Sequence, residues 1–203
     1  MYKRTCTQCF RSLWATLYAC DFFAVEILGM FGTVRVIVFF VIELRTRSVH
    51  IAGARVNPDG AWMIQIVRNL VDPEDGFLRN ATQLIHERDP LFTKVWVELL
   101  KSSGVKSVRI PASSPNYNPY AKRFVRTMRN ERLNHFVIFG DRHLRYLLHE
   151  YLAQYLGERF HQRLCGRLNV PRITSENDNS VIDTIRCRSR LGGLLNYDHR
   201  VAA

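Results

Sequence analysis

The sequence lacks any long apolar run. The longest one, Val36 to Ile42, falls far short of the roughly 20 residues that a membrane-spanning helix needs. Near the start, Lys3 and Arg4 are followed by no signal-like apolar stretch, because Arg11 interrupts it. We therefore expect neither a membrane span nor secretion. The sequence also contains no internal repeat and no low-complexity block.

Cysteines are few, and their number is odd: Cys6, Cys9, Cys20, Cys165 and Cys187. The first two form a C-x-x-C pair, but no second pair follows at the spacing of a zinc finger. The pattern favours reduced thiols in a cytoplasmic protein over a disulfide framework or a structural zinc site.

Acidic residues are also in short supply, with 18 Asp and Glu against 29 Lys and Arg, which gives a net charge of +11. Such an excess favours a polyanionic partner, and we rank nucleic acid before an anionic membrane. Arginine greatly outnumbers lysine, which suits bidentate contacts to phosphate. Charge alone leaves open a basic structural protein that binds RNA or membranes.

Aromatic residues, by contrast, are plentiful, with 12 Phe, 8 Tyr and 3 Trp, and 47% of the chain is apolar. This excludes disorder of the whole chain. The 203 residues suit one domain with short extensions and can bury a core without metal or disulfide staples.

The patterning predicts three strands followed by alternating helices and strands. We expect strands over 18–28, 33–44, 48–56, 82–86 and 107–110, and helices over 61–70, 90–102, 120–135 and 141–156. The region after Pro171 is expected to be irregular as far as Arg188. Three leading strands followed by crossover units predict a mixed α/β sheet with helices on its faces.

Acidic side chains lie on or just after two of these strands. Asp21 interrupts an apolar strand, where a carboxylate is costly unless it is paired or binds metal. The alternative is an edge position that faces solvent. Glu87 and Asp89 follow the fourth strand and can converge on Asp21 if the two strands are neighbours. Converging carboxylates would hold Mg²⁺ and support phosphodiester chemistry.

Several segments, in their order and spacing, carry a resemblance that spans nearly the whole chain. They are Asp21-Phe-Phe, Ile85-His-Glu-Arg-Asp-Pro-Leu-Phe92, Ser114-Pro-Asn-Tyr-Asn-Pro-Tyr-Ala-Lys-Arg-Phe-Val125, Glu158-Arg-Phe-His-Gln-Arg-Leu164 and Arg190-Leu-Gly-Gly-Leu-Leu-Asn-Tyr197. Together they resemble the integrase core of insertion-sequence transposases, which are relatives of retroviral integrases.

The resemblance implies a ribonuclease-H-like mixed five-stranded sheet with helices on both faces. It implies a lead-in over 1–17, a core over 18–170 and a tail over 171–203. It also implies Mg²⁺- or Mn²⁺-dependent DNA cleavage and strand transfer by an Asp, Asp, Glu triad. Asp21 matches the first acid, Glu87 stands at the second and Lys122 at the third, with 34 positions between the last two. His86 is expected to shape the site rather than to bind metal.

Two of the three acids are therefore changed. Glu87 keeps the charge but displaces its oxygens by about an ångström, which can cost on the order of 10²-fold in rate. Lys122 is the more severe change, since an ammonium has no lone pair to donate and repels Mg²⁺. Asp89 is a candidate substitute ligand, so the predicted metal ligands are Asp21, Glu87 and Asp89. We expect impaired catalysis, and the alternative is a non-catalytic DNA-binding remnant or a regulator of an active transposase.

A basic stripe is predicted on the helix that holds Lys122, with Arg126 and Arg129 at the following turns. The alternative for this stripe is a solvated helix face. We expect it to contact the phosphates of double-stranded DNA, together with neighbouring residues. The predicted DNA-binding residues are Asn116, Tyr117, Asn118, Lys122, Arg123, Arg126 and Arg129.

The resemblance further implies self-association or co-assembly with an active transposase, in the nucleoid of a bacterial cytoplasm. It also implies that the helix-turn-helix segment usual before such a core is missing here or separately encoded.

Overall fold

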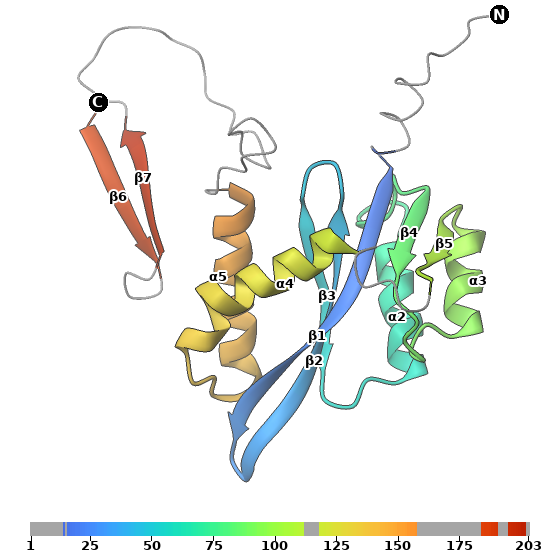
Figure 1. Ribbon diagram of the computed structural model, residues 1–203, viewed down its shortest axis with the longest axis horizontal. Helices are drawn as coiled ribbons and strands as arrows, with labels where there is room; N and C mark the ends of the chain where they lie inside the picture. Colours follow the sequence, from blue (N-terminus) through green and yellow to red (C-terminus); the bar gives the residue numbers. More distant parts are fainter. Residues whose placement is uncertain (1–13, 15, 112–117, 158–183, 191–194, 202–203) are drawn as a thin grey trace, which may run out of the picture. The chain divides into compact units, whose positions relative to one another are not determined.

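A computed structural model describes Trp14 and residues 16–111, 118–157, 184–190 and 195–201 (Figure 1). By its contacts the chain divides into two compact units, Met1–Leu144 and Arg145–Ala203. The domain limits expected from the sequence stay predictions. Among the described residues, no helix combines the length and the apolar character needed to cross a membrane.

The first unit is built on a mixed five-stranded sheet, as the sequence predicts. Its strands are β1 (Leu17–Gly29), β2 (Gly32–Glu43), β3 (Val49–Arg55), β4 (Gln83–His86) and β5 (Lys106–Arg109). Their order across the sheet is β3-β2-β1-β4-β5. The β1–β2 and β2–β3 pairs are antiparallel, whereas β4 and β5 run parallel to β1 and to each other. The consecutive strands β1, β2 and β3 thus form an antiparallel meander. The crossover connections add β4 and β5 as the parallel half of the sheet.

One face of the sheet is covered by helices α2 (Gly60–Leu70) and α3 (Lys94–Ser102). Strand residues of one parity, Cys20 and Phe39 among them, form a buried cluster with Met63 of α2 and Trp96 of α3. Because side chains alternate along a strand, the residues of the other parity face the opposite side. This alternation decides which face Asp21 occupies.

The opposite face is covered by α4 (Pro119–Glu131). Phe124 of α4 packs on Phe40 of β2 at 4.9 Å between ring centroids, and Phe40 in turn contacts Phe23 of β1. Phe124 and Phe40 are buried almost completely. Helices on both faces of the sheet therefore agree with the prediction.

Two boundaries differ clearly from those predicted. Helix α3 starts at Lys94 rather than at Pro90, because the side chain of Thr93 caps it by accepting a hydrogen bond from the Trp96 N–H. Helix α4 ends at Glu131, where Arg132 leaves the helical conformation, and a short 3-10 turn, η2 (Leu133–His135), follows. Helix α5 (Gly140–Gly157) lies where a helix is expected.

The C-terminal part contains an antiparallel pair of strands, β6 (Thr184–Arg190) and β7 (Leu195–Val201). The prediction of irregular structure up to Arg188 is thus wrong for residues 184–187. These strands carry many polar residues, so the apolar runs that mark β1 and β2 are missing from them.

Candidate functional site

The site lies where β4 ends beside β1, the strand that runs parallel to it and continues past this point to Gly29. Strand β1 pairs with β4 in the register Leu17–Gln83 to Ala19–Ile85. Asp21 and Glu87 each follow this last pair by two residues, so they share its parity and its level in the sheet. The sequence-based expectation that these two acids lie on neighbouring strands is matched by the geometry.

Asp21 lies half-buried on the face that α4 covers, opposite Phe40 in the β1–β2 register. Its Oδ1 accepts a hydrogen bond from the Phe22 N–H at 2.8 Å. The pKa of Asp21 is raised from 3.8 to about 6, chiefly by burial; the Phe22 N–H and the Lys122 ammonium lower this pKa, whereas the charges of Glu87 and Asp89 raise it. Asp21 is therefore neither a solvent-facing edge residue nor an isolated one.

Lys122 reaches the same place from the first turn of α4. Its Nζ lies 3.0 Å from Oε1 of Glu87, and both side chains are partly exposed, at 42% and 43%. The ion pair joins α4 to the end of β4. The residue at the position of the family's third acid therefore contacts the residue at the position of its second.

Asp89 is held in the turn after β4. Its Oδ1 accepts a hydrogen bond from the Leu91 N–H at 2.8 Å, and the Arg88 side chain next to it donates to the Ile110 carbonyl at 3.0 Å. Asp89 influences the pKa of Asp21, so it belongs to the same electrostatic environment. One of its oxygens is engaged in the turn.

His86 is completely buried just below the site. Its Nδ1 lies 2.8 Å from the Glu87 carbonyl, which can only accept, so Nδ1 carries the proton and Nε2 accepts from the Ser107 hydroxyl at 2.7 Å. Burial lowers the pKa of His86, which keeps the ring neutral. Both ring nitrogens are thus used, and His86 shapes the backbone that carries Glu87.

The start of α4 is anchored to the sheet. Asn118, which is 2% exposed, donates from Nδ2 to the Cys20 carbonyl at 3.1 Å, one residue before Asp21. The guanidinium of Arg47 lies 3.5 Å above the ring of Tyr120, and Trp14 contacts the same ring edge-on. Lys122 is therefore presented from a fixed helix end.

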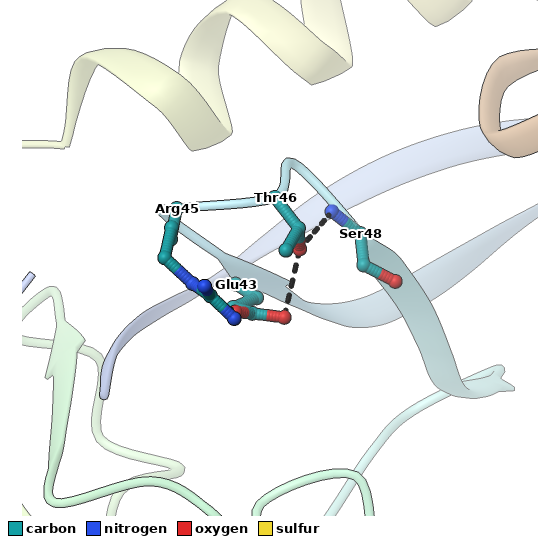
Figure 2. Close-up of polar contacts among 4 residues, drawn as sticks. All are labelled: Glu43, Arg45, Thr46 and Ser48. Carbon is teal, nitrogen blue, oxygen red and sulfur yellow. Dashed lines mark hydrogen bonds and ion pairs between the residues drawn. The ribbon is translucent and has the colours of Figure 1, made fainter. Parts of the chain in front are cut away.

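The turn between β2 and β3 holds Arg47 in this position. Thr46 donates from its hydroxyl to Oε2 of Glu43 at 2.7 Å and accepts from the Ser48 N–H at 3.1 Å (Figure 2). Arg45 pairs with the other oxygen of Glu43 at 3.5 Å. With this network in place, Arg47 takes a left-handed backbone conformation at φ 65°. Sequence reasoning missed this support.

A basic groove of about 650 Å³ runs from Asp21 along α4. The cations that line it are Lys122, Arg126 and Arg129 of α4 and Arg35 of β2. Arg129 also donates to the Ala24 carbonyl of β1 at 3.1 Å. Arg123 is exposed on the same helix but does not line the groove. Arg35 is a further residue that sequence reasoning missed, because a single arginine in a strand does not by itself indicate a binding surface.

The predicted DNA-binding residues thus fall into three groups. Lys122, Arg123, Arg126 and Arg129 are exposed on α4. Asn118 is buried and bonded to Cys20, so its side chain is not available to DNA and instead positions α4. Asn116 and Tyr117 lie outside the described residues.

The residues of this site do not fit a bound Mg²⁺ or Mn²⁺. Among the residues that the structure describes, no group of three His, Cys, Asp or Glu side chains is placed to hold a metal ion. The Lys122 ammonium occupies one oxygen of Glu87, and one oxygen of Asp89 serves its turn. A hard cation needs several oxygen ligands, and position 122 offers none.

No protein-family model and no curated protein matches this sequence. Solved structures do match. The chain is similar to the catalytic core domain of BIV integrase, with 14% identity over 76% of this chain and 91% of that one, at a TM-score of 0.55. This fold is that of a retroviral integrase core. It confirms the predicted ribonuclease-H-like α/β architecture.

Two further structures with this integrase-core fold agree. The HTLV-2 integrase catalytic core, solved with magnesium in a dimeric form, shares 8% identity over 76% of this chain and 93% of its own, with a TM-score of 0.57. A chain of the simian T-cell lymphotropic virus intasome shares 10% identity over 93% of this chain and 67% of its own, also at 0.57. At such identities the likeness establishes the fold.

Proposed function

We propose that this chain is a DNA-binding integrase-core protein of the insertion-sequence transposase type whose metal-dependent cleavage and strand transfer are lost. The observation that carries the proposal is the 3.0 Å ion pair between Lys122 and Glu87. It places an ammonium, which cannot ligate a metal, against a carboxylate that the chemistry would need. The integrase-core fold supplies the frame, and the site within it lacks a ligand set.

Binding to DNA is supported by the groove beside this ion pair. Four cations from α4 and β2 line it, and the whole chain carries a net charge of +11. Arginines spaced along one helix match the phosphates of a duplex and contribute affinity that depends on salt. This surface remains usable by a protein that performs no cleavage.

The test is nicking of supercoiled plasmid in Mg²⁺ and Mn²⁺ by the full chain. We compare wild type, Asp21→Asn, the double variant Glu87→Asp with Lys122→Glu, and that double variant combined with Asp21→Asn. Wild type is expected to bind the plasmid without nicking it. The double variant is expected to nick, and Asp21→Asn is expected to abolish this gain.

Nicking by wild type that Asp21→Asn abolishes would overturn the loss of catalysis. Equal binding to RNA and duplex DNA, or binding to anionic vesicles in place of DNA, would instead favour the basic structural protein.

We further propose that the protein acts in the bacterial nucleoid as a homo-oligomer or together with an active transposase. The dimeric form of the HTLV-2 core supports this, since it shows the same fold in an assembly. Light scattering of the purified chain measures self-association, and a single monomeric species at micromolar concentration counts against it.

A further inference from the structure

The ion pair joins two parts of the chain that are far apart in the sequence. Glu87 follows β4, and Lys122 lies on α4, beyond β5 and its loop. Their 3.0 Å contact ties the first turn of the helix to the end of the strand. In a metal-dependent site of this kind, a divalent ion would make that connection through its oxygen ligands.

The local charge explains why some cation is needed. The carboxylates of Glu87 and Asp89 lie close enough to Asp21 for their negative charges to disfavour its ionised form. Three anions in a partly buried site repel one another unless a positive charge lies among them. Lys122 supplies that charge, and the positive N-terminal end of α4, a helix of 13 residues, adds to it.

The backbone that carries Lys122 is held in place. The preceding residues of α4 are fixed by the buried Asn118 bond to Cys20 and by the packing of Tyr120 under Arg47. A divalent ion that entered would meet the ammonium near Glu87 and would gain no ligand from position 122.

We propose that the ammonium of Lys122 is the resident cation of this site and takes over the structural task of a divalent metal, so the folded chain neither binds nor needs one there. This rests on the proposed function for the identity of the site, but it concerns folding and metal binding rather than DNA. It also implies that one substitution, Lys122→Glu, turns the site into one that depends on a divalent ion.

The test measures thermal unfolding of the full chain in EDTA, Mg²⁺ or Mn²⁺, with calorimetric titration of Mn²⁺ alongside. The variants are Lys122→Glu, Lys122→Met and, as a matched control, Arg123→Glu, which reverses the same charge at the next, exposed residue outside the groove. No DNA is present.

Wild type is expected to melt at the same temperature in all three solutions and to bind no Mn²⁺ at millimolar concentration. Lys122→Glu is expected to melt several degrees lower in EDTA, to regain this loss in Mn²⁺ and to bind the ion. Arg123→Glu is expected to respond to neither. Lys122→Met, which removes the ammonium but keeps the packing of its stem, is expected to melt below wild type in EDTA.

Stoichiometric binding of Mn²⁺ by wild type, or a rise in its melting temperature with Mg²⁺, overturns the proposal. So does a Lys122→Glu variant as stable in EDTA as wild type. If Lys122→Glu does not fold in EDTA, the comparison of Lys122→Met with wild type decides: an unchanged melting temperature overturns the proposal. The two proposals can fail separately. If wild type shows no response to metal and the double variant of the nicking experiment does not nick, this inference stands and the proposed function alone is overturned.

Discussion

At the scale of single residues, Asp21 shows how a functional position can cost stability. The carboxylate lies half-buried in a largely apolar stretch of β1, with one hydrogen bond from the Phe22 N–H. Its charge is opposed by burial and by two neighbouring carboxylates, and only partly offset by Lys122. A residue that costs stability in this way is expected to serve chemistry rather than folding.

We predict that Asp21→Asn stabilises the protein at pH 8. The pKa of Asp21 is raised from 3.8 to about 6, so the folded state binds the proton more tightly than the unfolded chain does. The stability gained from this proton is complete below about pH 4 and is lost as the pH rises through 6. Removal of the charge should therefore restore up to about 3 kcal/mol at pH 8 and little at pH 4.

Urea unfolding of wild type and Asp21→Asn at pH 4, 6 and 8 measures this difference. Asp75→Asn, at an exposed position, is the control for loss of the same charge. A variant that is less stable than wild type at pH 8 would contradict the prediction.

At the scale of elements, the decisive feature is the attachment of α4 to β1. Asn118 precedes the helix, and its buried amide bonds to a carbonyl of β1 some hundred residues away in the chain. Without this bond, the Cys20 carbonyl would be buried and unpaired, and the helix would lose its fixed start.

We predict that Asn118→Asp destabilises the protein by on the order of 3 kcal/mol, because it places an acceptor against the Cys20 carbonyl without changing the size of the side chain. Asn80→Asp, at an exposed position, introduces the same charge and should change stability by less than about 0.5 kcal/mol. Chemical denaturation at pH 7 compares the two. Equal stabilities would show that the bond does not hold the helix.

The elements also show what the sequence could and could not predict. Apolar runs revealed β1 and β2, and the crossover order implied a mixed sheet, so the meeting of Asp21 with Glu87 was foreseeable. The role of Asn118 was not, since an asparagine before a helix suits a ligand contact and a buried bond equally well. Pro90 suggested too early a start for α3, because the cap that fixes the start is Thr93.

Other features depend on distant contacts that no local pattern encodes. The stacking of Arg47 on Tyr120 joins a hairpin turn to a helix end, and the place of Arg35 beside α4 follows from the β1–β2 register. From the sequence, Lys122 and Glu87 could be recognised only as two departures from the acids of the family. Their ion pair could not be predicted. That they contact each other is a result of the fold.

At the scale of the whole molecule, the 203 residues carry a net charge of +11. Four of its cations line one groove on the α4 side of the sheet. A long-range field of this kind attracts any polyanion, whereas the groove selects where the polyanion lies. The two contributions can be separated by a matched pair of charge deletions.

We predict that Arg126→Gln weakens binding to duplex DNA and lowers the slope of log K against log salt by about 0.9, the loss of roughly one phosphate contact. Arg68→Gln removes an equal charge from an exposed position on α2, across the sheet, and should leave the slope unchanged. Fluorescence anisotropy over a range of salt concentrations measures both. Equal slopes for the two variants would exclude the groove as the DNA contact.

The ion pair at the end of β4 also has a genetic consequence. A single nucleotide change converts a lysine codon into a glutamate codon, and another converts glutamate into aspartate. If the ammonium is the resident cation, the order of these changes matters. A mutant that first acquires Lys122→Glu depends on cellular Mg²⁺ for its full stability, whereas one that first acquires Glu87→Asp keeps an ion-pair partner for the lysine. Reversion toward a complete acid triad is therefore short in mutational steps, and it avoids a magnesium-dependent intermediate only when Glu87→Asp comes first.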